Sequence, residues 1–127
     1  MITLGSLSPT RDLNFVKDTA RGFIMAAESE QVVGEVVNLG SNYEISVGDL
    51  ATKIAGIMGK EIQIGTGAER IRPEKSEVER LWAANAKAKL LMDWQPGYTL
   101  DQGLRETISW FSTEGNMQFY KPDLYNI

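Results

Sequence analysis

The sequence predicts an α/β fold, and three observations support this class. Helical stripes of apolar residues alternate along the chain with short extended segments. Only two of the extended segments, 35–39 and 61–64, have the pattern of a convincing strand. A sheet of two or three strands is a poor platform for this many apolar helices. We therefore expect α+β packing for the chain in isolation, and a chain that is part of something larger or pairs with another copy.

The first half of the chain predicts an extended entry, one helix and one strand. Residues 1–13 are expected to be extended, because Ile2 and Leu4 alternate with polar neighbours. Asp18 is a suitable N-cap for a helix over 19–28. Gly34 and Gly40 bound the apolar run 35–39, which predicts a buried strand. The helix has apolar residues at i, i+3, i+4 and i+7, which predict one buried face: Ala20, Phe23, Ile24 and Ala27.

The second half predicts three helices and one further strand. Ser46 with Asp49, and Thr99 with Gln102, have the spacing of capping boxes at the starts of two helices. Gly59 is the expected end of the first of these helices. Residues 61–64 alternate as a half-exposed strand, 85–92 form a compact helix, and the stripe of the last helix is Leu100, Leu104, Ile108 and Phe111.

Composition excludes several classes of protein. The 127 residues fit one domain, and the net charge of -4 argues against nucleic-acid binding, which needs a basic surface. The chain has no cysteine and no histidine, which removes disulfides, thiol nucleophiles, histidine bases and zinc sites of the usual ligand types. No apolar run is long enough to cross a membrane and no signal peptide is evident, so we expect a cytoplasmic protein.

The segment that begins Gly65-Thr66-Gly67 has the first two glycines of a dinucleotide-binding motif. This segment follows a predicted strand, as a dinucleotide-binding loop would. Arg70 stands where the third glycine belongs, however, and Pro73 interrupts the helix that should follow. We interpret the segment as a turn and expect no cofactor site in this chain.

Arg11, Arg72 and Glu77 are the candidate binding residues. Both arginines lie beside residues that fix the backbone, and two guanidinium groups converging on one diphosphate would bind it with bidentate hydrogen bonds. The Glu77 carboxylate could accept hydrogen bonds from sugar hydroxyls. From the residues alone, surface salt bridges and a solvated glutamate are the commoner outcome.

The segments 8–18, 37–40, 72–96 and 100–111 together resemble, in order and spacing, one family. It is the extended short-chain dehydrogenase/reductases that act on nucleotide sugars, the NAD-dependent epimerase/dehydratase family. Bacterial nucleotide-sugar 4,6-dehydratases are the most similar, and 4-epimerases come next. The resemblance implies that Arg11 and Arg72 hold the substrate diphosphate and that Glu77 binds the ribose hydroxyls. It also implies that the full-length family oxidises the sugar at C4 with tightly held NAD.

Three motifs of the family precede the segment that matches residues 8–18, which contains Arg11-Asp12. They are the glycine-rich NAD loop, the active-site Ser/Thr and the Tyr-x-x-x-Lys pair, and none has a counterpart in this sequence. We therefore expect a C-terminal portion without catalytic residues. Residues 1–45 would be a remnant of the nucleotide-binding domain, and 46–127 a small substrate-binding lobe. The alternatives are a stand-alone binding or interaction module and a nonfunctional folded remnant. Exposed Phe23, Ile24 and Val37 are expected to drive self-association into a homo-oligomer.

Overall fold

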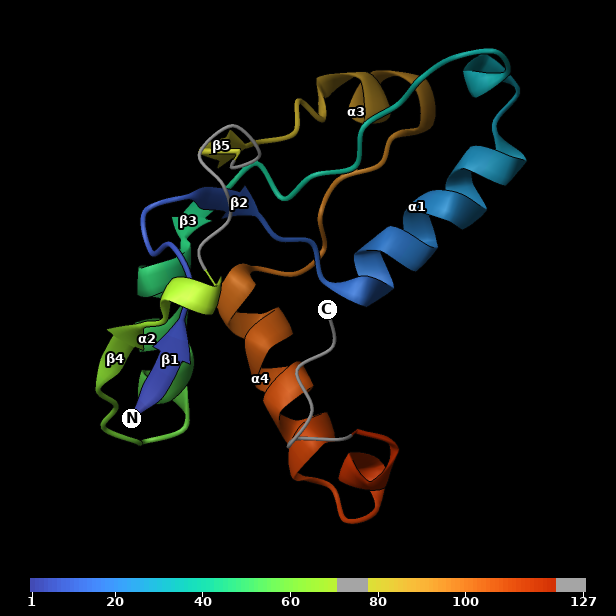
Figure 1. The fold of residues 1–127 in the computed structure, drawn as a ribbon. Coiled ribbons are helices and arrows are strands. Elements are labelled where there is room, and N and C mark those ends of the chain that lie inside the picture. Colours follow the sequence, from blue (N-terminus) through green and yellow to red (C-terminus); the bar gives the residue numbers. More distant parts are fainter. Residues whose placement is uncertain (71–77, 121–127) are drawn as a thin grey trace.

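The computed structural model describes residues 1–70 and 78–120, which form two small sheets and four α-helices (Figure 1). Helix α2 lies with β1 and β4 at one end of the molecule, and α1 and α3 lie at the other. The second sheet lies between the two ends, and α4 extends away beside it. The α-helices and strands are β1 Ile2–Leu4, β2 Thr10–Asp12, α1 Val16–Glu28, β3 Glu44–Ser46, α2 Val47–Ile57, β4 Ile64–Thr66, β5 Arg80–Leu81, α3 Ala86–Met92 and α4 Leu100–Ser112. Short 3-10 turns cover Glu30–Val32, Ala68–Arg70 and Asn116–Phe119.

The two sheets join segments that are distant in sequence. β1 pairs in parallel with β4, with Ile2 opposite Ile64. In the other sheet β2 is the middle strand, antiparallel to β3 and parallel to β5, which gives the order β3-β2-β5. Arg11 is opposite Ile45 on one side and Leu81 on the other. The candidate residue Arg11 therefore lies at the centre of a small sheet.

The predicted caps of α2 and α4 are confirmed. The Ser46 side chain accepts from the Asp49 amide, and Thr99 and Gln102 form a reciprocal capping box. Gly59 has a φ of 63°, the left-handed conformation expected of a residue just past a helix end. These boundaries depend on residues three or four positions apart, which is why the sequence predicts them.

The main apolar core lies where α1 meets α3. Ala88, Met92 and Trp94 are buried, and partly buried residues of α1 and of 32–39 pack around them. A Cβ on Gly22 of α1 would overlap the Leu39 side chain and lie 3.1 Å from Trp94 Nε1. Glycine at this position therefore permits the close approach of α1 to Trp94.

Asp18 is not the N-cap that we predicted. Helix α1 begins earlier, at Val16, with Phe15 as an N-cap that makes no side-chain hydrogen bond. Asp18 is instead in the first turn, and its side chain is 2% exposed. Its carboxylate accepts from the amides of Gly97 (2.9 Å) and Tyr98 (3.0 Å), about 80 residues away. Sequence-local reasoning could not find partners at this separation.

The buried face of α1 is also different from the prediction. The stripe predicted to be buried is on the outside: Phe23 is 69% exposed and Ile24 is 59% exposed. The face that packs inward has Asp18, Gly22 and Met25. Periodicity identified an apolar face correctly, but no other element of the described residues covers it. Of the residues expected to be exposed, Val37 is half-buried against the Trp94 cluster.

The predicted strand at 35–39 is not formed. This segment has no strand assignment, and Val37 and Leu39 pack against the Trp94 cluster. A β-strand needs a neighbour for its backbone hydrogen bonds, and no strand pairs with 35–39 in the described part of the chain. The other predicted strand is present but is shifted, because β4 covers Ile64–Thr66 rather than 61–64.

Candidate functional site

Arg11 is presented by the middle strand of the β3-β2-β5 sheet. Its side chain is half-buried, and its Nη1 donates to the Thr10 carbonyl at 2.7 Å. Side chains alternate along a strand, so Thr10 and Asp12 lie on the face opposite to Arg11. The chain thus separates a cationic side chain on one face of β2 from a polar network on the other.

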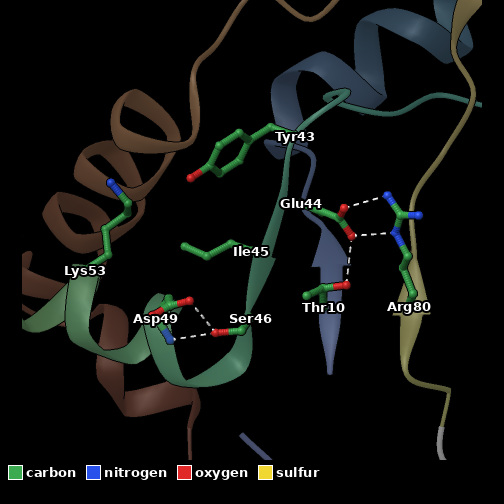
Figure 2. A pocket seen from close by; sticks show the side chains of 8 residues that line it. All are labelled: Thr10, Tyr43, Glu44, Ile45, Ser46, Asp49, Lys53 and Arg80. Carbon is green, nitrogen blue, oxygen red and sulfur yellow. Dashed lines mark hydrogen bonds and ion pairs between the residues drawn. The ribbon is translucent and has the colours of Figure 1, made fainter. Parts of the chain in front are cut away.

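Glu44 connects all three strands on that opposite face (Figure 2). Its Oε2 accepts from Thr10 Oγ1 and from Arg80 Nε, both at 2.8 Å, and its Oε1 accepts from Arg80 Nη2 at 2.6 Å. Arg80, and to a lesser extent Thr10, hold the pKa of Glu44 below its ordinary value. The Arg80 guanidinium also lies 4.6 Å from the centroid of the Trp82 ring. This network ties β5 to β3 across β2.

Asp12 connects the end of β2 to two further segments. Its Oδ1 accepts from the Ser41 amide at 2.7 Å and from Ser41 Oγ at 2.5 Å. Its Oδ2 accepts from the amides of Asn42 at 3.2 Å and Ala83 at 3.4 Å. A Cβ on Gly40 would overlap Ala83 and lie 2.8 Å from Asp12 Oδ2, so glycine is required where these segments meet.

The face with Glu44 also borders a surface hollow of about 570 Å³ at the start of α2 (Figure 2). Tyr43 and Ile45 extend from β3 towards Lys53, on the side away from Arg80. Three of the charged groups around the hollow are paired with an opposite charge within the chain: Glu44 with Arg80, and Lys53 with Asp101 at 2.8 Å. The Asp49 carboxylate accepts from Ser46 Oγ at 2.6 Å. We therefore do not assign a ligand to this hollow.

Of the residues predicted for binding, the structure places only Arg11. Arg72 and Glu77 lie outside the described residues, so their predicted roles remain predictions. Sequence reasoning missed Asp12, although it directly follows Arg11, and missed the pair of Glu44 and Arg80. The available signal was an acidic residue beside the candidate arginine, but its partners are 29 or more residues away.

The described residues do not fit an NAD phosphate at the Gly65–Gly67 segment. β4 includes Gly65 and Thr66, and residues 68–70 form a 3-10 turn rather than the first turn of an α-helix. The Glu69 carboxylate lies against Gly67, where a phosphate would have to approach the backbone. A carboxylate there would repel a diphosphate. Within residues 1–70 and 78–120 there is no group of three or more acidic, histidine or cysteine side chains that could hold a metal ion.

Comparison with known proteins identifies the family. A family model described as GDP-mannose 4,6 dehydratase matches residues 1–107. The chain belongs to this family. It is 30% identical, over 84% of its length, to UDP-glucuronate 4-epimerase from Thermodesulfobacterium geofontis, of which it covers 31%. These matches confirm the family resemblance and include both dehydratases and epimerases.

Solved structures of the same family share the fold. One is dTDP-glucose 4,6-dehydratase from Bacillus anthracis in complex with NAD, with a TM-score of 0.80, 30% identity and coverage of 94% of this chain and 36% of that one. Another is UDP-glucuronic acid 4-epimerase from Bacillus cereus in complex with UDP-glucuronic acid and NAD, with a TM-score of 0.75, 27% identity and coverage of 93% and 35%. The α/β class is thereby confirmed, and the chain spans about a third of the length of these relatives. No helix among the described residues is long and apolar enough to cross a membrane.

Proposed function

We propose that this chain supplies part of the nucleotide-sugar-binding region of an NAD-dependent nucleotide-sugar 4,6-dehydratase or 4-epimerase. The observation that carries the proposal is the position of Arg11, at the centre of a braced sheet in a chain of this family. A half-buried guanidinium loses less side-chain freedom on binding than an exposed one, and its planar fork suits a diphosphate.

Arg72 and Glu77 complete the proposed site. Glu77 comes three residues before β5, the strand next to Arg11. A second guanidinium near Arg11 would share the charge of the diphosphate, and the Glu77 carboxylate would accept from the ribose hydroxyls. We also propose that the protein is cytoplasmic. Residues 1–45 would belong to a nucleotide-binding domain, and residues 46–127 to the substrate-binding lobe. NAD chemistry is assigned to the relatives that bind NAD, and no step through NAD is derived from the described residues.

Isothermal titration of the chain with UDP-glucose, GDP-mannose and dTDP-glucose tests the proposal. We expect saturable binding of at least one of these ligands, and loss of that binding in Arg11→Ala and in Arg72→Ala. Arg105→Ala is the matched control, because Arg105 is exposed on α4 and lies outside the proposed site. Absence of binding to all three ligands, or equal losses in the three variants, would contradict the proposal.

A second function is favoured by the outer face of α1. Phe23 and Ile24 are 69% and 59% exposed and are joined there by Val16, which is 69% exposed. Apolar groups gathered on one helix face favour association with another protein surface. A stand-alone interaction module that forms homo-oligomers through α1 is therefore the second candidate. This second function predicts that self-association of the chain is unchanged in Arg11→Ala.

A further inference from the structure

The β3-β2-β5 sheet is too short for its backbone ladder alone to fix the orientation of Arg11. β2 and β3 have three residues each, and β5 has two. Isolated strand pairs of this length are marginal in water. Side-chain hydrogen bonds must therefore contribute much of what holds β5 beside β2, and those made to a charged group are the stronger ones.

Asp12 provides such hydrogen bonds at the end of the strand that has Arg11. The amides of Ser41 and Asn42 are consecutive and both point at the carboxylate. Asn42 has a φ of 58°, a left-handed conformation that helps consecutive amides converge on an anion. The Ala83 amide, two residues after β5, donates to the same carboxylate. One side chain thus joins β2, the turn before β3 and the segment after β5.

The Asp12 carboxylate is not itself placed to bind a diphosphate. Strand alternation directs it to the face opposite Arg11. Its negative charge would repel a phosphate, and its two oxygens already accept four hydrogen bonds. Its effect on a ligand bound by Arg11 would have to pass through the position of the strands.

We propose that Asp12 is a positioning residue for diphosphate binding, because it fixes β5 and the 41–42 turn against β2 and so sets the direction of the Arg11 guanidinium. This inference rests on the proposed function, since the ligand it concerns is the nucleoside diphosphate of a sugar nucleotide. Glu44, which is opposite Asp12 in the register, accepts hydrogen bonds from Thr10 and Arg80 at the other end of β2 and so adds a second connection between the strands. Both sets of hydrogen bonds lie on the face of the sheet opposite to the Arg11 side chain.

Asp12→Asn tests the proposal, because the amide keeps the size of the side chain, removes its charge and directs an NH₂ at donors. Asp49→Asn is the matched control, since Asp49 accepts from Ser46 Oγ at 2.6 Å at the start of α2. In the ligand-free chain, we expect Asp12→Asn to shift the Arg11 Nε–Hε NMR signal and to speed amide exchange of Ala83 at least tenfold. In titrations with UDP and uridine, we expect Asp12→Asn to bind UDP with at least tenfold lower affinity than the wild type, and uridine with an affinity that is much less reduced.

A general loss of structure would weaken UDP and uridine equally, and that result would overturn the positioning role. Wild-type and Asp12→Asn chains that bind UDP within twofold of each other would also overturn it. If the wild-type chain binds no nucleotide, the proposed function fails, and the NMR measurement still decides the present inference. An unchanged Arg11 signal and unchanged Ala83 exchange would then contradict it. Should Asp12→Asn not fold, Ser41→Ala removes one donor to the carboxylate and is expected to act in the same direction with a smaller effect.

Discussion

Asp18 and Asp12 each accept hydrogen bonds from backbone amides of distant segments, but they lie in different surroundings. Asp18 is 2% exposed and joins α1 to the turn before α4, beside the buried Trp94 ring. Asp12 is only half-buried and joins three segments around a strand with a half-buried arginine. The same kind of interaction therefore stabilises the buried core at Asp18, whereas at Asp12 it orders segments near the surface. The predictions below test this contrast.

Replacing Asp18 should have the largest effect on stability. Asp18→Ala leaves the amides of Gly97 and Tyr98, and one guanidinium hydrogen bond from Arg21, without an acceptor. We expect a loss of about 3 kcal/mol in the free energy of unfolding, measured by urea denaturation. Glu114→Ala, at an exposed position, is the control and should change it by less than about 0.5 kcal/mol. Equal losses of stability in both variants would refute the claim that Asp18 holds α1 against the turn before α4.

The same carboxylate predicts a dependence of stability on pH. Burial alone would raise the pKa of Asp18, but hydrogen bonds from Arg21, Gly97 and Tyr98 outweigh it and lower the pKa below the ordinary value of 3.8. The folded state therefore binds fewer protons than the unfolded state. The stabilisation is complete above pH 3.8 and is lost as the pH falls through the folded-state pKa. Thermal melts between pH 2 and 6 should show a steeper acid loss for the wild type than for Asp18→Asn.

Loss of the α4 cap should have an intermediate effect. Thr99→Ala removes the acceptor for the Gln102 amide and half of the capping box. We expect a loss of about 1 kcal/mol, because one first-turn amide loses its partner. Thr113→Ala is a suitable control. Thr113 lies just after the end of the same helix, and its hydroxyl donates to the Ser109 carbonyl. A cost for Thr113→Ala as large as that for Thr99→Ala would show that the cap is not the cause.

Changes on the outer face of α1 should affect stability least and association most. Phe23→Ser with Ile24→Ser removes apolar groups that are already exposed, so the free energy of unfolding should change by less than about 0.5 kcal/mol. Static light scattering should show self-association of the wild type that decreases in this variant. A wild-type chain that stays monomeric over a wide concentration range would remove the basis for a homo-oligomer.

Local features of this fold follow from the sequence, while its long-range features do not. The caps at Ser46 and Thr99, the end at Gly59 and the left-handed Asp93, with a φ of 53°, depend on near neighbours. Aspartate tolerates the left-handed conformation of Asp93 better than most residues do. Such positions can be predicted from the sequence because their partners are within four residues.

The failures have one common physical cause. The stripe of α1 and the run 35–39 have the right composition for buried elements, but burial and strand formation need a partner surface that composition does not supply. Asp18 has the chemistry of an N-cap, but its carboxylate accepts from the amides of Gly97 and Tyr98 instead of from first-turn amides of α1. In the candidate site, the sequence predicted Arg11 but not the Asp12 network, because the donors to Asp12 are Ser41, Asn42 and Ala83, which are 29 to 71 residues away.

The central claim, that the Arg11 side of β2 binds the diphosphate of a nucleotide sugar, is tested most directly by one titration. UDP-glucose, GDP-mannose and dTDP-glucose are titrated into the wild-type chain, Arg11→Ala and the control Arg105→Ala under identical salt conditions. The account predicts saturable binding of at least one ligand by the wild type and by Arg105→Ala, with at least a tenfold loss in Arg11→Ala. Binding that is unchanged in Arg11→Ala would contradict it.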